Sequence, residues 1–361
     1  MSGPSPRKVF KDISSYSLPA LETMAEKRTH RMSFNELPFG ASPAAIAAYH
    51  KASECISRYP EERSVSLIMA LKTHYELKAE KIFISAGSDS ILNDIAAAYI
   101  EHGDEIIISE HSYCLYKEAT ERWNGVSILV PETAELKIDI DGIIAAISEK
   151  TKIIYVTNPA NPMGTIISPA QIRRLHSMIP SHILLVIDAA YAEFIEQDND
   201  YDDFFSLTDC SSDNVVILRS FSKIYGLAGL RIGWAYGSPS VVKVLEYLND
   251  GYTVTVVAQE TAIAALKDQD FTERMRAYND KWQNTFYREL TKLGIEITPS
   301  RANFFMMHFS DIETAEKVAE YLSGHGIYIN KLMAYSLPKS LRVTISTPVA
   351  NEHFLELMKQ R

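Results

Sequence analysis

Short runs rich in Ile, Val and Leu alternate with helix-like segments from about residue 80 onwards. The runs predict seven strands, at 81–85, 105–109, 126–130, 152–158, 183–188, 215–220 and 231–237. Amphipathic stretches such as 89–100 and 168–179 lie between them, and Ser168-Pro169 is typical of a helix start. Nearly continuous apolar strands between helices indicate an α/β fold, with a mostly parallel seven-stranded sheet sandwiched by helices.

The pattern changes after about residue 255, where long helices are followed by three apolar runs. These runs lie at 303–309, 326–330 and 341–347, and they predict a smaller α+β unit. We therefore expect a large domain at 36–254 and a small domain formed by 1–35 together with 255–361.

Composition narrows the classes of protein to consider. A net charge of −10 over 361 residues argues against a nucleic-acid partner, which requires a surplus of Lys and Arg. No apolar run is long enough to span a membrane, and the first ten residues lack the apolar segment of a secretory signal. Cys55, Cys114 and Cys210 are scattered, so we expect neither a disulfide framework nor a metal site, and we expect a cytoplasmic protein.

Polar residues follow five of the predicted strands directly. They are Ser85 to Asp89, His111 to Tyr113, Asn158 to Pro162, Asp188 to Tyr191 and Ser220 to Lys223. Open α/β sheets bind ligands beyond the carboxyl ends of their strands, so these residues are expected to converge on one site.

Two of these residues carry distinctive chemistry. Lys223 comes just after an apolar strand, and desolvated lysines are the ones that form Schiff bases with carbonyl compounds. Asp188 ends the run "ILLVID", where a buried carboxylate needs a partner to stay charged. It is either a cap of the next turn or the partner of a protonated heterocyclic nitrogen.

One cofactor, pyridoxal 5′-phosphate, matches the whole set. Lys223 would bind its aldehyde and act as catalytic base, and Asp188 would hold the ring nitrogen. Tyr191, with a catalytic role, and Asn161 would bind the phenolic oxygen, and Tyr113 would cover the ring. The residues expected at the phosphate are Gly87, Ser88, Ser220, Ser222 and Arg231, the last because its planar fork suits phosphate. Asp89, in the same turn, is also expected to bind the cofactor.

Ordered motifs carry a resemblance to a known family. "FNELPFGASP", "RYPE", "NPANPMG", "SFSKIYGLAGLRIG" and "LRVTISTP" resemble, in order, motifs of the fold-type I, aspartate-aminotransferase-like enzymes. The match is closest to the histidinol-phosphate aminotransferase subfamily, and it runs from about Asn35 to the C-terminus.

The resemblance implies an aminotransferase that moves an amino group between an amino acid, or an amine derived from one, and a 2-oxo acid by a ping-pong mechanism. It implies that Arg342, with Asn161, grips the acidic group of the substrate. It also implies a homodimer in which Tyr59 reaches the cofactor phosphate of the neighbouring subunit.

Two positions depart from the subfamily pattern. Met163 replaces the usual threonine of N-P-T-G, a change expected to affect only the turn. Asn330, in "GIYIN", stands where the subfamily has an arginine that helps to bind the substrate's phosphate. Lys331 is adjacent, but on a strand it would point to the opposite face. The departure at Asn330 puts histidinol phosphate in doubt as the substrate and favours an amino acid instead.

Alternatives remain at this stage. A decarboxylase of the threonine-phosphate type shares the fold and the motifs, and a true histidinol-phosphate aminotransferase is a further possibility. "SFSK" and Ser212-Asp213-Asn214 match two serine β-lactamase motifs, but in the wrong order and without K-T-G.

Overall fold

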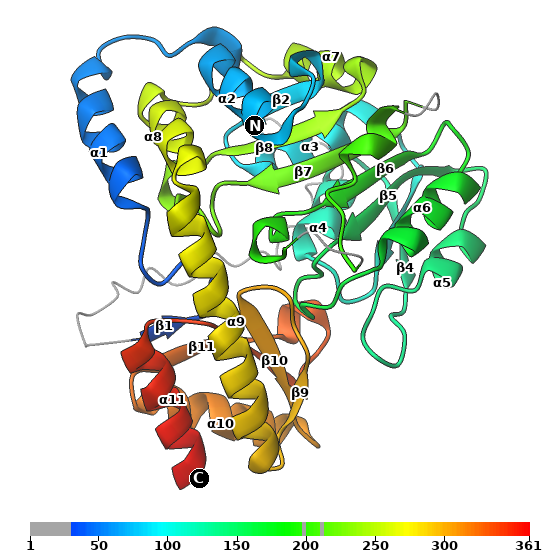
Figure 1. The fold of residues 1–361 in the computed structure, drawn as a ribbon. Coiled ribbons are helices and arrows are strands. Elements are labelled where there is room, and N and C mark those ends of the chain that lie inside the picture. The colour runs from blue at the N-terminus through cyan, green and yellow to red at the C-terminus, as the bar shows by residue number, and fades with distance from the viewer. Residues whose placement is uncertain (1–29, 197–199, 210–212) are drawn as a thin grey trace, which may run out of the picture.

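The computed structural model describes residues 30–196, 200–209 and 213–361 as two β-sheets with helices packed around them (Figure 1). The strands of the larger sheet are β2 (Ile82–Ser85), β3 (Glu105–Ser109), β4 (Val126–Val130), β5 (Thr151–Thr157), β6 (Leu184–Asp188), β7 (Val215–Ser220) and β8 (Gly233–Gly237). The strands of the smaller sheet are β1 (His30–Met32), β9 (Glu296–Thr298), β10 (Phe304–His308), β11 (Ile327–Lys331) and β12 (Ser340–Thr344). The α-helices are α1 (Pro43–Ala52), α2 (Val65–Tyr75), α3 (Ser88–Tyr99), α4 (Cys114–Arg122), α5 (Ile140–Ala145), α6 (Pro169–Met178), α7 (Pro239–Leu248), α8 (Val256–Lys267), α9 (Gln269–Lys292), α10 (Ile312–Gly324) and α11 (Pro348–Gln360).

The larger sheet has the strand order β2-β8-β7-β6-β5-β3-β4. The pairs β7–β6, β6–β5, β5–β3 and β3–β4 are parallel, whereas β8 runs antiparallel to both β7 and β2. The predicted mostly parallel, seven-stranded sheet is therefore confirmed. Because β8 runs in the opposite direction, its first residues lie at the edge where the neighbouring strands end.

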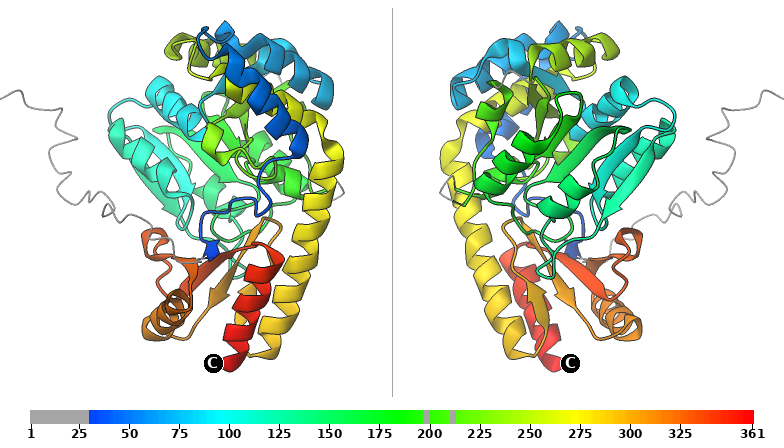
Figure 2. Two further views of the ribbon diagram at one scale, coloured as in Figure 1. Left: turned by 90° about the vertical axis from the view of Figure 1, so that its left-hand side faces the viewer. Right: turned by 90° about the vertical axis from the view of Figure 1, so that its right-hand side faces the viewer.

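Helices cover both faces of this sheet, as its apolar strands require (Figure 2). Ile91 and Ile95 of α3 and Leu245 of α7 share one core with strand residues such as Ile106. On the other face, α5 and α6 pack over a second core. Helix α6 begins as its sequence predicted, with Ser168 as the N-cap and a proline in the first turn. Ser168 and Gln171 form a capping box there.

The smaller sheet has the order β1-β11-β12-β10-β9, and β1 and β9 were not predicted. Each of these two strands has three residues, which is too short to show an alternating pattern. The long helix α9 connects the two units. Phe271 and Met275, near its start, belong to a core of the larger unit, whereas Trp282 and Phe286 belong to the core of the smaller one.

The position of α8 bears on the expected domain boundary. Its residues Ala258, Ala262 and Leu266 share a core with Leu67 and Leu71 of α2. We propose that the large domain extends to the end of α8, rather than ending at residue 254. Residues 1–29, which were expected in the small domain, lie outside the described residues.

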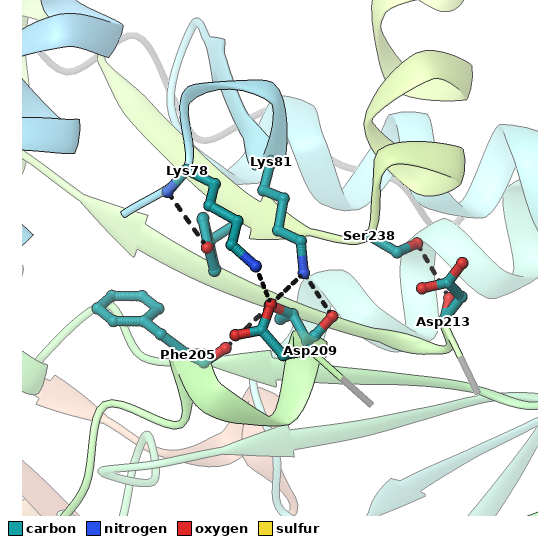
Figure 3. Close-up of polar contacts among 8 residues, drawn as sticks. Lys78, Lys81, Phe205, Asp209, Asp213 and Ser238 are labelled. Atoms are coloured by element: carbon teal, nitrogen blue, oxygen red, sulfur yellow. Dashed lines mark hydrogen bonds and ion pairs between the residues drawn. The ribbon is translucent and has the colours of Figure 1, made fainter. Parts of the chain in front are cut away.

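The start of β2 is fixed by a buried lysine (Figure 3). Lys81 donates from Nζ to the carbonyl oxygen of Thr208 at 2.6 Å and to Asp209 Oδ1 at 2.9 Å. Lys78 donates to the same carboxylate oxygen at 2.9 Å. These contacts tie the turn η7 (Phe205–Asp209) to β2 at the end opposite Ser85. The start of β2 is thereby held in place.

In the described part of the chain, no helix is both long enough and apolar enough to cross a membrane. Nor do the described residues include a group of three or more His, Cys, Asp or Glu side chains placed to hold a metal ion.

Candidate active site

A cavity of about 490 Å³ lies where the carboxyl ends of the large sheet face the small sheet. Eleven of the thirteen predicted site residues line it: Ser88, Asp89, Tyr113, Asn161, Asp188, Tyr191, Ser220, Ser222, Lys223, Arg231 and Arg342. Residues more than 250 positions apart in the chain thus meet in one place.

Asp188 is the most deeply buried acid of this group. It ends β6 with 5% of its surface exposed, and it accepts hydrogen bonds from the Tyr116 hydroxyl at 2.7 Å and from the Ala190 N–H at 3.1 Å. Burial raises the pKa of Asp188 to about 6, although the two hydrogen bonds oppose the shift. A cation in the cavity would lower this pKa and keep Asp188 charged over a wider range of pH.

Tyr116 was not predicted as a site residue. Its ring stacks on Tyr155 at 4.7 Å, and its hydroxyl also lies 2.8 Å from Thr157 Oγ1. Buried carboxylates generally need such donors, but nothing in the sequence marks which tyrosine supplies one.

Lys223 lies in the loop that follows β7 and is half-buried in the cavity wall. Its Nζ is 5.3 Å from the centre of the Tyr191 ring. The Tyr191 hydroxyl in turn accepts a hydrogen bond from Asn35 Nδ2 at 2.9 Å. Lys223 and Tyr191, which were predicted to bind the aldehyde and the phenolic oxygen of the cofactor, are therefore neighbours.

Several groups suited to an anion surround the start of α3. Arg231 Nη2 lies 3.4 Å from Asp89 Oδ2, and Ser222 donates its N–H to Ser220 Oγ. Gly87 adopts a φ of +91°, and a Cβ there would come within 2.8 Å of Arg231 Nη2. A side chain at Gly87 would therefore displace the arginine, so this glycine keeps space for it. Gly233 has a similar role, because a Cβ there would lie 2.5 Å from the Ser88 nitrogen.

The opposite wall carries a buried arginine, Arg342, whose orientation is fixed by its neighbours. Arg342 is only 4% exposed, and it donates from Nη1 to Asn161 Oδ1 and from Nη2 to the Ser33 carbonyl oxygen at 2.9 Å. Its guanidinium lies 5.2 Å from the Phe304 ring centre. A buried guanidinium with fixed neighbours is already oriented for a bidentate contact.

Tyr59 does not line the cavity of its own chain. It is 87% exposed, and its ring lies 5.3 Å from that of Tyr252. Gly87 is also absent from the lining residues, although it adjoins Arg231 as described.

Some cavity residues were missed by the sequence analysis. They are Arg31, Phe34, Asn35, Glu36, Thr157, Ala190, Ala228 and Tyr335. Asn330, noted in the sequence as a departure, lines the cavity as well. The segment 31–36 enters through β1, which was too short to predict, so no local signal placed it here.

The arrangement fits pyridoxal phosphate. An amine, a buried carboxylate that needs a cation and an anion site at a helix N-terminus share one cavity. Each part of this cofactor has a matching group on the cavity wall.

Comparisons with known proteins agree with this geometry. Residues 29–357 match the family model for aminotransferase class I and II. A histidinol-phosphate aminotransferase from Rhodopseudomonas palustris (strain TIE-1) is 39% identical over 364 residues, covering 100% of this chain and 99% of that protein. One from Nitrobacter winogradskyi is 38% identical, covering 97% of this chain and 96% of that protein.

Solved structures show the same fold. The histidinol-phosphate aminotransferase of Sinorhizobium meliloti in complex with pyridoxal-5′-phosphate has a TM-score of 0.86 at 25% identity, over 92% of this chain and 91% of that one. Aspartate aminotransferase from Thermus thermophilus with maleate has a TM-score of 0.81 at 20% identity, over 92% and 91% of the two chains. The chain belongs to the aminotransferase class I and II family, and it is a pyridoxal-phosphate-dependent aminotransferase with the aspartate-aminotransferase fold.

Proposed function

We propose that this aminotransferase acts on an α-amino acid whose carboxylate is held by Arg342 and Asn161, and that Lys223 moves the proton at the substrate's Cα. The observation that carries the proposal is that the clamp, Lys223 and Asp188 face one cavity. When bound, pyridoxal phosphate supplies an aldehyde that condenses with amines and a ring that accepts electrons.

The other residues would orient the cofactor and stabilise its charges. Asp188 would hold the ring nitrogen protonated, and Tyr191 and Asn161 would donate to the phenolic oxygen. Tyr113 would cover the ring face. The groups proposed for the phosphate are Gly87, Ser88, Asp89, Ser220, Ser222 and Arg231. Asp89 would act there by orienting Arg231 rather than by touching the phosphate, since two anions repel each other.

Removing the amine tests the central role. Lys223→Ala should still bind the cofactor but lose transamination by several orders of magnitude, because no other amine replaces the base. Lys243→Ala, which changes an exposed lysine on α7, is the matched control and should keep wild-type turnover. Steady-state rates and the visible absorbance of the bound cofactor give the two measurements. Near-normal turnover of Lys223→Ala would disprove the assignment.

The buried acid gives a prediction for the cofactor-free protein. The pKa of Asp188 is raised in the folded state, so its carboxylate destabilises the fold once the pH rises from about 4 through 6. Above pH 6, the free energy of unfolding of cofactor-free Asp188→Asn should therefore exceed that of cofactor-free wild type by up to about 3 kcal/mol. The variant should accordingly unfold at a higher temperature. The difference should vanish near pH 4.

Thermal scans near pH 4 and at pH 7.5 measure this difference in stability. In a separate assay, the activity of the cofactor-loaded variant should fall by roughly 10²–10³-fold. Equal stability at pH 7.5, together with activity reduced less than tenfold, would make Asp188 a structural cap.

Substrate preference follows from the charges on the clamp side. Asn330 leaves a neutral side chain where the subfamily pattern has arginine, and its Nδ2 lies 3.4 Å from the Ser33 carbonyl oxygen. Arg342 is the one arginine on β11 and β12, so a phosphate loses one charge-assisted contact on these strands, at a cost of roughly 1.5–3 kcal/mol. A monoanionic carboxylate still has Arg342 as its bidentate partner.

We therefore expect a higher kcat/KM on at least one free α-amino acid than on histidinol phosphate. Arg342→Ala should act mainly by raising KM for that amino acid. A side-by-side assay, with CO2 release followed in parallel to detect decarboxylation, decides the matter. The proposal fails if histidinol phosphate is the best substrate.

We also propose that the enzyme is a cytoplasmic homodimer in which Tyr59 serves the neighbouring subunit's phosphate site. The support is the position of Tyr59, which is 87% exposed and is not among the residues that line the cavity of its own chain. Ile56 and Tyr252 are exposed as well, at 71% and 48%, and buried contact with a second copy would explain such apolar exposure.

Mixed dimers test this arrangement. A dimer of one Tyr59→Ala and one Lys223→Ala subunit has one site with both residues intact, so mixing should raise activity above either parent at limiting cofactor. Mixing Tyr59→Ala with the double variant Tyr59→Ala/Lys223→Ala should give no gain. Sedimentation establishes the mass of each sample, and absence of any gain in a confirmed mixed dimer would contradict the proposal.

A further inference from the structure

A second arginine, Arg31, enters the cavity wall from β1. This strand pairs in parallel with β11, where Arg31 lies opposite Tyr328. Phe34 and Glu36, a few residues later, line the cavity too. The site therefore has a guanidinium near the strand that carries the neutral Asn330, but on a different element.

Arg31 is held differently from the other arginines of the cavity. It forms a double contact with Glu36, with Nε donating to Oε2 at 2.9 Å and Nη2 donating to Oε1. The side chains are 44% and 39% exposed, and the guanidinium lies 5.4 Å from the Phe34 ring centre. An ion pair this exposed contributes little to stability, so little free energy is needed to open it.

The remaining arginines have other partners. Arg342 is buried against Asn161 and Ser33, and Arg231 lies beside Asp89 and the Ala228 carbonyl oxygen. Arg31 can thus turn from Glu36 to a ligand without breaking either of those arrangements.

A ping-pong enzyme binds two different substrates in the same cavity, one after the other. A closed Arg31–Glu36 pair presents no net charge to a neutral side chain. An open pair presents a bidentate fork to a carboxylate. We propose that Arg31 binds the distal carboxylate of a dicarboxylic substrate, and that Glu36 holds Arg31 when the substrate's side chain is neutral. This inference rests on the proposed function, in which Arg342 and Asn161 take the α-carboxylate.

Glutamate and glutamine provide matched probes, because they have nearly the same shape and differ in side-chain charge. In single-turnover reactions of the holoenzyme, Arg31→Gln should lower the preference for glutamate over glutamine by roughly tenfold, as expected for loss of a charge-assisted contact at a partly exposed site. Glu36→Gln should raise that preference several-fold, because it removes the competing carboxylate.

Binding supplies a readout that is independent of turnover. Calorimetry with glutarate, and with pentanoate as the monocarboxylate control, should show weaker glutarate binding to Arg31→Gln and tighter binding to Glu36→Gln, with pentanoate unchanged. Lys331→Gln is the matched control, since Lys331 is an exposed cation on β11 that does not line the cavity. Its affinities should equal those of wild type.

The outcomes separate the two proposals. The inference is overturned if Arg31→Gln keeps the wild-type preference, if glutarate does not bind the wild type, or if Glu36→Gln weakens glutarate binding as much as Arg31→Gln does. If no amino acid reacts but the glutarate affinities change as expected, the proposed function fails and the role of Arg31 stands.

Discussion

A carboxylate buried at the end of a central strand, Asp188, is the constraint around which this site is built. An acid so well shielded from water must be neutral or must face a cation, and its raised pKa expresses that requirement. Tyr116 and the Ala190 N–H fix its two oxygens. The carboxylate therefore has one orientation, and a cationic ring nitrogen placed against it would gain a charge partner that is already desolvated and aligned.

The joint between the two units depends on a few buried polar residues. Asn35 donates from Nδ2 to the Tyr191 hydroxyl and from its backbone N–H to Thr344 Oγ1, while its carbonyl oxygen accepts from Asn303. The contact of Arg342 with Asn161 also crosses the joint. Because these groups are buried, displacing either unit would leave polar atoms without partners. The two walls of the cavity, one from each unit, are thus held in a defined relation.

The loop that follows β7 and carries Lys223 is supported by a buried charge network. Arg219, 1% exposed and adjacent to Ser220, pairs with Asp203 and lies 3.7 Å from Glu193. Glu193 follows Tyr191 by two residues. Removing one member of such a buried group leaves an uncompensated charge, so the network resists movement of the loops that carry Lys223 and Tyr191. In contrast, the Arg31–Glu36 pair at the cavity is exposed, and its side chains are not held by a buried network of this kind.

The sequence by itself determined the strands of the large sheet, the polar residues that follow them and the cofactor that the protein uses. These features are local: β-branched runs specify strands, and parallel strands that end at one edge bring their next residues together. The direction of β8 was not predicted, because the loop from Ser220 to Gly233 is at the lower limit for a parallel crossover and so permits either direction. An antiparallel β8 explains why Arg231 and Lys223 share one edge.

Only the tertiary structure decided which side chains support these residues. Tyr116 meets Asp188 across 72 positions, and Asn35 meets Tyr191 across 156. Arg31 reaches the cavity because a three-residue strand pairs with β11. Such contacts depend on how two sheets pack, and no periodicity in a single segment encodes that packing. The reactive residues of the site could therefore be predicted from local motifs. The residues that orient them, and Arg31 at the cavity wall, are placed by contacts between distant segments.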